Sequence, residues 1–221
     1  MTSATPSFPW LHWLHHASFR IESQGQVLYI DPIKVRSAVP ADYIFVTHDH
    51  GDHFSPADIR KLAKPGTVLV CPQRVARLAQ GVQTLVARPG EAFTVGPHRG
   101  RAVASYNRRK PMHPKRHAST GFILDLPEGR LYHAGDTDFI DEMAAPEFKG
   151  LRLALLPTGK LLGLFSPTMG PDQAAQAVRM MEPDFAVPMH YGTLPGSRGG
   201  GDSFRRAVGD KALILPEEEP L

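Results

Sequence analysis

The most informative stretch of this 221-residue chain is YIFVTHDHGDH, which spans residues 43–53. Its second half places three histidines and two aspartates between positions 48 and 53. Imidazole nitrogens and carboxylate oxygens suit a borderline cation such as zinc, and a catalytic metal site keeps an open position where water binds and loses a proton. This density of ligand atoms therefore predicts a catalytic metal site.

The residues on both sides predict that the histidine-rich stretch joins a strand to a helix. The apolar run 43–46 is rich in aromatic and β-branched residues, which is typical of a short buried strand. Downstream, Ser55 is a typical N-cap, Pro56 suits the first helical position, and Asp58 places an acid in the first turn. The candidate ligands thus follow the carboxyl end of a strand.

Alternation within this tight loop predicts two neighbouring metal sites. His48 and His50 can serve one cation, while Asp52 and His53 point to another side and serve a second. We expect Gly51 to supply backbone freedom at the turn between the two pairs, because glycine adopts conformations that other residues avoid.

The spacing His48-x-His50-x-Asp52-His53 resembles the signature of the metallo-β-lactamase superfamily of metal-dependent hydrolases. The resemblance extends along nearly the whole chain, through the segments 16–21, 28–32, 132–138, 167–170 and 187–193. It is strongest to the small single-domain branch that includes ascorbate-6-phosphate lactonase-like and N-acyl-phosphatidylethanolamine phospholipase D-like hydrolases. It implies an α/β fold, the four-layer αββα sandwich, with residues 1–221 as one hydrolase domain.

The resemblance also implies a ligand set for two divalent cations, zinc first, with manganese or iron as alternatives. Three histidines would hold one cation, two histidines and an aspartate the other, and a second aspartate would bridge them: His48, His50 and a later histidine; Asp52, His53 and His190; Asp136. The strand-like runs 131–133 and 185–187 deliver Asp136 and His190 at or just after strand ends, where open α/β architectures place their ligands.

The later histidine is chosen from His98, His113 and His117, which all lie between the first cluster and the bridging aspartate. We choose His113, because its surroundings resemble the segment that carries this ligand in small relatives, and Pro114 favours an extended backbone before it. His117 is the alternative, and we expect it to be a solvated loop residue. His98 follows Gly96-Pro97 in an expected hairpin turn and is predicted to lie at the surface.

The mechanism follows from this ligand set. Two cations that share a hydroxide lower the pKa of bound water to roughly 7, so no serine or cysteine nucleophile is needed. Asp52 is the candidate to orient this nucleophile and to act as general base. The predicted activity is hydrolysis of an ester, lactone or phosphodiester bond in a small molecule.

Basic side chains flank His113, which favours an anionic substrate group such as phosphate or carboxylate. The candidate substrate contacts are Arg109, Arg116 and Lys160. A solvated basic loop is the alternative for the first two. The apolar run 160–165 is either a lid or part of the core.

Two other functions remain open. A nucleic-acid-processing phosphodiesterase is compatible with the formal charge of +3, but the chain lacks room for the extra modules that such branches carry. A non-catalytic metal-binding protein on the same scaffold is disfavoured by the full ligand set. The sequence predicts no oligomeric state.

Composition favours an ordinary globular enzyme, since 42% of residues are hydrophobic and 21% are charged, enough for one sizeable core. The single cysteine, Cys71, cannot form an internal disulfide and is expected to be a buried strand residue. Neither a signal peptide nor a membrane-length apolar run is visible, so a cytoplasmic location is predicted. Helices are expected over 73–79 and 172–181, and a solvated tail over 216–221.

Overall fold

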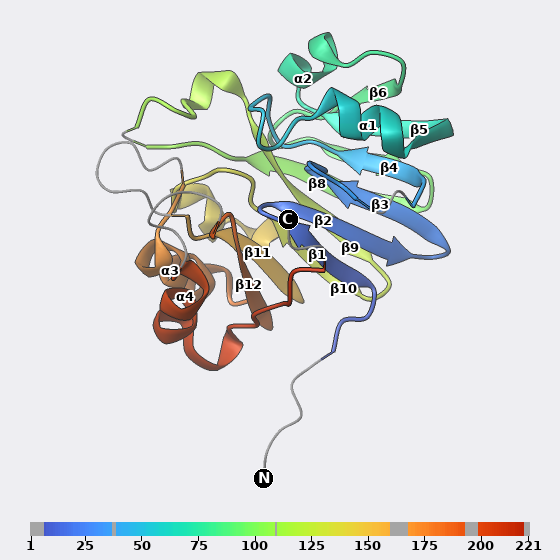
Figure 1. Ribbon diagram of the computed structural model, residues 1–221. Coiled ribbons are helices and arrows are strands. Elements are labelled where there is room, and N and C mark those ends of the chain that lie inside the picture. The colour runs from blue at the N-terminus through green and yellow to red at the C-terminus, as the bar shows by residue number, and fades with distance from the viewer. Residues whose placement is uncertain (1–6, 37–38, 109, 160–167, 193–198, 219–221) are drawn as a thin grey trace.

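Two six-stranded sheets lie face to face (Figure 1) in a computed structural model that describes residues 7–36, 39–108, 110–159, 168–192 and 199–218. The first sheet has the order β1-β2-β3-β4-β5-β6, with bounds Leu11–His15, Ser18–Ser23, Gln26–Ile30, Ala41–Phe45, Ala63–Cys71 and Gln83–Val86. The second has the order β12-β11-β10-β9-β8-β7, with bounds, from β7 to β12, of Ala92–Val95, His98–Ala104, Thr120–Leu126, Gly129–His133, Leu153–Pro157 and Phe185–Met189.

Each sheet combines an antiparallel half with a parallel half. In the first sheet β1, β2 and β3 are antiparallel, and β3 to β6 are parallel. In the second sheet β7 to β10 are antiparallel, and β10, β11 and β12 are parallel. Parallel strands end at the same edge of their sheet, so the loops that follow them gather there.

Helices cover the outer faces of the two sheets. They are α1 Pro56–Leu62, α2 Gln73–Leu78, α3 Pro171–Met181 and α4 Gly200–Val208, with short 3-10 helices at Lys115–His117, Asp141–Ala144, Pro146–Phe148 and Gly209–Lys211. Helix α2 contacts β6, whereas α3 contacts β11 and α4 contacts β12. The order helix, sheet, sheet, helix confirms the αββα sandwich.

Helix α1 begins as the sequence predicts. Ser55 has an extended backbone, and its hydroxyl accepts a hydrogen bond from the Asp58 backbone N–H at 3.2 Å. Pro56 occupies the first turn, where the missing N–H costs nothing. The apolar side of the helix, Ile59 and Leu62, is buried against the outer face of the first sheet.

The main core lies between the sheets, where Phe45 of β4 meets Phe122 of β9 edge to face, with ring centroids 5.3 Å apart. Cys71 is buried at the end of β5, as expected, and this burial raises the pKa of its thiol to about 12. The thiol therefore stays protonated and packs as a small apolar side chain.

The expectation that His98 lies at the surface is wrong. The 96–98 turn does join β7 to β8, but His98 is buried and packs edge to face on Tyr43, with ring centroids 5.7 Å apart. The turn folds against that tyrosine so closely that a Cβ on Gly96 would lie 1.9 Å from its hydroxyl oxygen.

Two residues of the expected solvated tail pair with the first sheet. Glu217 forms a parallel bridge with Trp13, and the Glu218 N–H donates to the Trp13 carbonyl at 2.9 Å. His15 Nδ1 donates to Glu217 Oε1 at 2.6 Å. The carboxylates of the acidic tail thus find histidine partners on β1, which composition alone did not indicate.

Candidate metal centre

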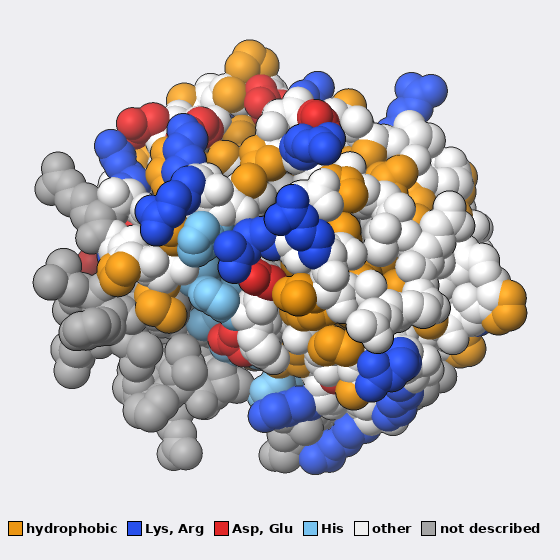
Figure 2. All heavy atoms as spheres, turned by 90° about the horizontal axis from the view of Figure 1, so that it is seen from above, with side chains coloured by type: hydrophobic (Ala, Val, Ile, Leu, Met, Phe, Trp, Pro, Cys, Tyr) orange, Lys and Arg blue, Asp and Glu red, His pale blue; other side chains and the backbone are white. Residues whose placement is uncertain are grey.

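Four loops at one edge of the sandwich bring the candidate ligands together. The loop 48–53 follows β4, Asp136 follows β10, and His190 comes directly after β12. His113 lies in the connection between β8 and β9. Figure 2 shows histidine side chains reaching the surface in one area of this face, with acidic side chains beside them.

The first donor group contains His48, His50 and His113. The Nε2 atom of His113 lies 3.3 Å from Nε2 of His48 and 2.9 Å from Nδ1 of His50. Two nitrogens bound to one tetrahedral zinc at roughly 2.0–2.1 Å stand roughly 3.3–3.4 Å apart. The three imidazoles therefore already have the spacing of ligands around one cation.

Neighbouring groups fix which ring nitrogen faces this cation position. Asn107 Oδ1 accepts from His113 Nδ1 at 3.0 Å. The Thr47 hydroxyl donates to Asp31 at 2.7 Å, so its oxygen accepts from His48 Nδ1 at 3.0 Å. With both Nδ1 atoms protonated, the Nε2 lone pairs of His48 and His113 face each other, an arrangement that a cation stabilises.

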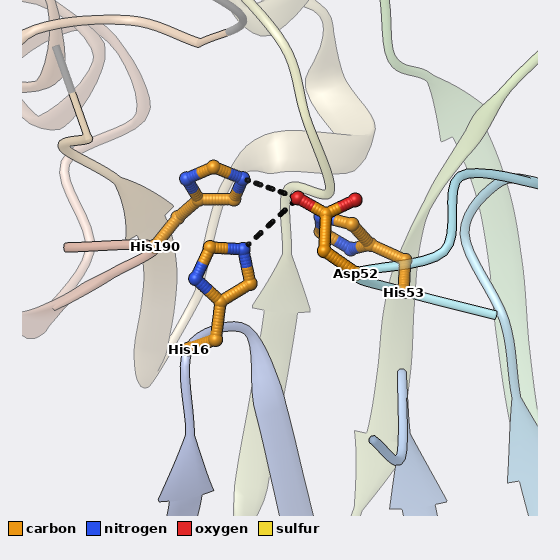
Figure 3. A group of neighbouring side chains, drawn as sticks. All are labelled: His16, Asp52, His53 and His190. Atoms are coloured by element: carbon orange, nitrogen blue, oxygen red, sulfur yellow. Dashed lines mark ion pairs between the residues drawn. The ribbon is translucent and has the colours of Figure 1, made fainter. Parts of the chain in front are cut away.

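The second donor group contains Asp52, His53 and His190, together with His16, which the sequence interpretation did not select. His16 Nε2 lies 3.4 Å and His190 Nε2 lies 3.8 Å from the same Asp52 oxygen, Oδ2. Figure 3 shows the two rings pointing at this oxygen, with His53 behind the carboxylate.

Asp136 lies between the two groups. One of its carboxylate oxygens is 3.2 Å from His53 Nε2, and the other is 3.1 Å from His190 Nε2 and 3.7 Å from His113 Nε2. Its side chain is only 2% exposed. This is the placement that a bridging carboxylate requires.

Asp31 supports the second group from behind, and the sequence interpretation assigned it no role. Its carboxylate accepts from His53 Nδ1 at 2.7 Å and from the Thr47 backbone N–H at 2.7 Å. Both side chains of the Asp31–His53 pair are fully buried. The pair leaves His53 Nε2 directed at Asp136, as carboxylate–histidine pairs do at metal sites.

Burial and charge act against each other in the centre. Burial lowers the pKa of His53, but the carboxylates of Asp136 and Asp31 outweigh it and raise this pKa well above its usual range. Burial likewise raises the pKa of Asp136, but His190 and His53 hold it well below its usual range. For His48, burial dominates and lowers the pKa.

The buried polar atoms of the centre fit a bound cation. Within the part of the chain that the structure describes, the buried Nε2 atoms of His53 and His190 make no well-oriented hydrogen bond, although Asp136 oxygens lie 3.2 and 3.1 Å away. Unsatisfied buried polar groups are costly and rare in native structures. Imidazole and carboxylate lone pairs that converge in this way are the donor set of a transition-metal site.

Other predicted residues lie apart from this centre or differ from expectation. His117 is half-buried in a 3-10 helix and belongs to neither donor group, Arg116 is exposed, and Arg109 and Lys160 lie outside the described residues, as does the 160–165 run. The expectation for Gly51 is wrong, since its φ is not positive and a Cβ there would meet nothing within 4 Å.

A cavity of about 330 Å³ opens beside the second donor group and shares His16 and Asp52 with it. Its lining residues are His15, His16, Ile33, Lys34, Gly51, Asp52, Ser55 and Asp58. A larger hollow of about 710 Å³ over β7, β8 and β9 contains none of the candidate ligands, so we assign no catalytic role to it.

The facing sheets and the histidine–aspartate centre at their edge define a metal-dependent hydrolase of the metallo-β-lactamase fold. The sequence model of the Beta-lactamase superfamily domain matches residues 10–190. UPF0173 metal-dependent hydrolases from Caldivirga maquilingensis and Thermococcus kodakarensis are 35% and 36% identical to this chain. These alignments cover 89% and 94% of the chain and 88% and 96% of the relatives.

Solved structures agree with this family. A protein from Parabacteroides distasonis described as a metal-dependent hydrolase has a TM-score of 0.79 at 28% identity, and the match covers 92% of this chain and 91% of that one. The metallo hydrolase Igni18 from Ignicoccus hospitalis shares the fold, with a TM-score of 0.76 at 24% identity and 96% of each chain covered. The chain belongs to the UPF0173 metal-dependent hydrolases of this superfamily.

Membership makes this protein a metal-binding hydrolase. Among the described helices, none has the length and apolar character needed to cross a lipid bilayer.

Proposed function

We propose that this protein hydrolyses an ester, lactone or phosphodiester bond in a small anionic molecule, with two divalent cations as cofactors. Zinc is the first choice and manganese or iron the alternatives, because mixed imidazole and carboxylate donors accept all three. When bound, the two cations would lower the pKa of water so that a nucleophile is available at neutral pH, and they would polarise the scissile bond. The position of Asp136 supports this proposal most directly, because its carboxylate lies within 3.7 Å of histidines from both donor groups.

In this proposal His48, His50 and His113 would hold the first cation, Asp52, His53 and His190 would hold the second, and Asp136 would contact both. Asp52 has a second role. Its side chain is 45% exposed and lines the cavity, unlike the buried Asp136. Burial raises the pKa of Asp52, but His16 and His53 outweigh it and keep the carboxylate ionised. We therefore propose that Asp52 accepts a proton from the attacking water and orients that water toward the cavity.

The substrate group next to Asp52 is proposed to bind in the 330 Å³ cavity, which is at the lower end of the range for small-molecule sites. Lys34 is the only cation of its lining, and no carboxylate of the described residues lies within ion-pair distance of its amine. By contrast, Arg108, Lys110 and Lys115 are each paired with an acid. Lys34 is therefore the favoured contact for a phosphate or carboxylate, with Arg109, Arg116 and Lys160 as alternatives.

We further propose that residues 1–221 act as one hydrolase domain in the cytoplasm. Both sheets contribute to one continuous core, which supports a single domain. The only cysteine is reduced and buried, as is usual in a reducing compartment.

The test is a hydrolysis screen of lactones, phosphodiesters and acyl esters with the metal-loaded protein. Asp136→Ala should reduce kcat/KM at least about 100-fold, beyond the loss typical of residues that only support ligands. Asp125→Ala is the matched control, since this exposed aspartate pairs with Arg130 on the second sheet, away from the centre. Activity that survives in Asp136→Ala would refute the mechanism.

Lys34→Ala tests the substrate contact. Loss of an ion pair to the substrate should raise KM for an anionic substrate by roughly tenfold, equivalent to about 1.4 kcal/mol, and leave KM for a neutral analogue unchanged. Arg116→Ala should change neither value. A higher KM in Arg116→Ala alone would move the contact to the loop around His113.

A further inference from the structure

His16 occupies the turn between β1 and β2 and faces the second donor group. Its side chain is 2% exposed, and its Nε2 atom lies 3.4 Å from Asp52 Oδ2. His190 approaches the same oxygen from another side (Figure 3). One ligand atom from each of His16, Asp52, His53 and His190 lies within 4.8 Å of all the others.

The backbone holds this histidine in an uncommon conformation. His16 has a φ of 54°, and histidine is one of the non-glycine residues enriched there. Its carbonyl accepts two hydrogen bonds, from Trp13 Nε1 at 3.0 Å and from the His190 backbone N–H at 2.9 Å. His190 is itself left-handed, with a φ of 59°. Backbone contacts thus fix the two residues against each other.

The end of the hairpin is anchored from the opposite sheet and from the C-terminal segment. His133 Nε2 of β10 donates to the Ala17 carbonyl at 2.9 Å. Glu217 accepts from His15, directly before His16, and Glu218 hydrogen-bonds to the backbone of Trp13. These contacts keep the turn at the edge where the metal loops meet.

The distances around His16 are those of a shared cation. A nitrogen and an oxygen bound to one five-coordinate cation at roughly 2.1 Å, with roughly 90–120° between the two bonds, stand roughly 3.0–3.6 Å apart. The His16–Asp52 separation of 3.4 Å falls within this range. The His16 and His190 rings have centroids 3.8 Å apart, which is close for two side chains that would repel each other if both were protonated. Two neutral imidazoles that donate lone pairs to one ion avoid this repulsion.

We infer that His16 is a protein ligand of the second cation, in addition to Asp52, His53, His190 and the bridging Asp136. This inference rests on the proposed two-cation centre and deepens it. The second cation then has three nitrogen and two oxygen donors from the protein, against three nitrogens and one oxygen for the first. Five protein donors favour a cation that accepts more than four ligands, and they leave its site less open than the first.

The test is a Co²⁺ titration of the metal-free protein, followed by calorimetry and by the visible absorption of bound cobalt. His16→Asn removes the imidazole and keeps a residue that tolerates the left-handed backbone. We expect the second Co²⁺ to bind at least about 100-fold more weakly, a loss larger than most supporting residues cause. We also expect the absorption of the second cobalt to change, because its coordination number falls.

His12→Asn is the matched control on the same hairpin, since His12 pairs with Glu22 and Glu218 instead of the centre. It should bind two Co²⁺ ions as the unmodified protein does. If His12→Asn loses the second ion equally, His16 acts only through hairpin stability and the inference fails. Two tightly bound ions with an unchanged spectrum in His16→Asn would also overturn it. If the unmodified protein binds no second Co²⁺, the proposed two-cation function itself fails.

Discussion

At the residue scale, the centre depends on side chains that touch no substrate. Asp31 is the clearest example, because it accepts hydrogen bonds from His53 and from both the backbone and hydroxyl of Thr47. Through Thr47 it also orients His48. One carboxylate therefore sets the ring orientation of a histidine in each donor group.

Asp31→Asn should lower the affinity for divalent cations roughly 10–100-fold, the range typical of groups that orient metal ligands. The amide is a weaker acceptor for His53 Nδ1 and lets the ring turn. Competition with a chelator of known affinity measures the change. Asp42→Asn is the control, since Asp42 accepts from the Val27 N–H on the first sheet and pairs with Lys64. If Asp31→Asn and Asp42→Asn bind divalent cations equally well, Asp31 does not orient the metal ligands.

His53 predicts a pH dependence of metal binding. Its pKa in the metal-free protein is raised well above the usual value of about 6.5, since Asp136 and Asp31 outweigh burial. A cation binds the neutral ring, so binding near pH 7 should release this proton, and affinity should rise with pH up to the raised pKa. Calorimetry in buffers of different ionisation enthalpy counts the protons released. If metal binding releases no proton near pH 7, His53 is not protonated in the metal-free protein, contrary to this prediction.

The shifted pKa values of His53 and Asp136 also determine how the stability of the metal-free protein changes with pH. Protonated His53 stabilises the fold. Its contribution to the free energy of unfolding is complete below about pH 6.5 and is lost as pH rises through the raised pKa. The contribution of the depressed Asp136 pKa is present above about pH 3.9 and is lost as pH falls through the lowered value. Urea unfolding should therefore show a maximum between these limits. A stability that keeps rising above neutral pH would be contrary to this expectation.

The spacing of histidines and aspartates in the 48–53 loop predicted two neighbouring pairs of ligands, and this assignment stays a prediction. The structure brings these side chains close together, and it also places the His48 ring next to the His53 ring, with centroids 4.2 Å apart. His16 and Asp31 were not predicted to belong to the centre, although both lie in segments that carry the family resemblance. Nothing near them in sequence marks a ligand. Their role depends on a hairpin turn that meets the end of β12 and on a loop packed behind His53, and such contacts exist only after folding.

At the element scale, the close approach of two strand ends positions His190. Gly159 follows β11, and a Cβ there would lie 1.9 Å from the His190 carbonyl oxygen and 2.7 Å from its Nδ1. No side chain fits without displacing the ligand loop. Glycine at this position is therefore required by the neighbouring backbone, and its φ is not positive.

Gly159→Ala should destabilise the protein by roughly 1–3 kcal/mol through overpacking, and it should weaken binding of the second cation more than the first. Chemical denaturation and metal titration measure the two effects. Gly199→Ala is the matched control, because a Cβ at that position meets nothing within 4 Å. A Gly159→Ala protein with unchanged stability and two tight sites would show that the His190 loop has room to move.

Sequence patterns that act within a few residues, such as helix caps and helical spacing, predicted the helices well. The Ser55 cap and the first-turn proline of α1 are in place, and α3 covers the expected 172–181 span. Local sequence patterns did not predict the burial of His98 or the pairing of C-terminal residues with β1. Their burial and pairing depend on Tyr43 and on β1, which lie far away in the sequence.

At the scale of the whole molecule, two sheets packed face to face hold the metal loops at one edge. The alternation of strands and helices predicted only a mixed α/β protein, and the family resemblance was needed to predict four layers. Sheet-to-sheet packing is not encoded in any single segment. It arises from aromatic pairs such as Phe45 and Phe122, which meet across the core.

Phe122→Ala should lower the free energy of unfolding by about 3–5 kcal/mol, because the ring is fully buried and leaves a cavity between the sheets. Leu78→Ala, at a position that is 53% exposed, should change it by no more than about 0.5 kcal/mol. Urea unfolding of the metal-free proteins gives both values. Similar losses in the two variants would be inconsistent with the assigned core.

The two-cation centre is best tested by anomalous diffraction from crystals of the zinc-loaded protein, measured on both sides of the zinc absorption edge. We expect two peaks per chain, each about 2.0–2.2 Å from its ligand atoms. One should contact His48, His50 and His113, the other Asp52, His53 and His190, and Asp136 should contact both. A single peak, or peaks away from these side chains, would contradict a two-cation hydrolase centre.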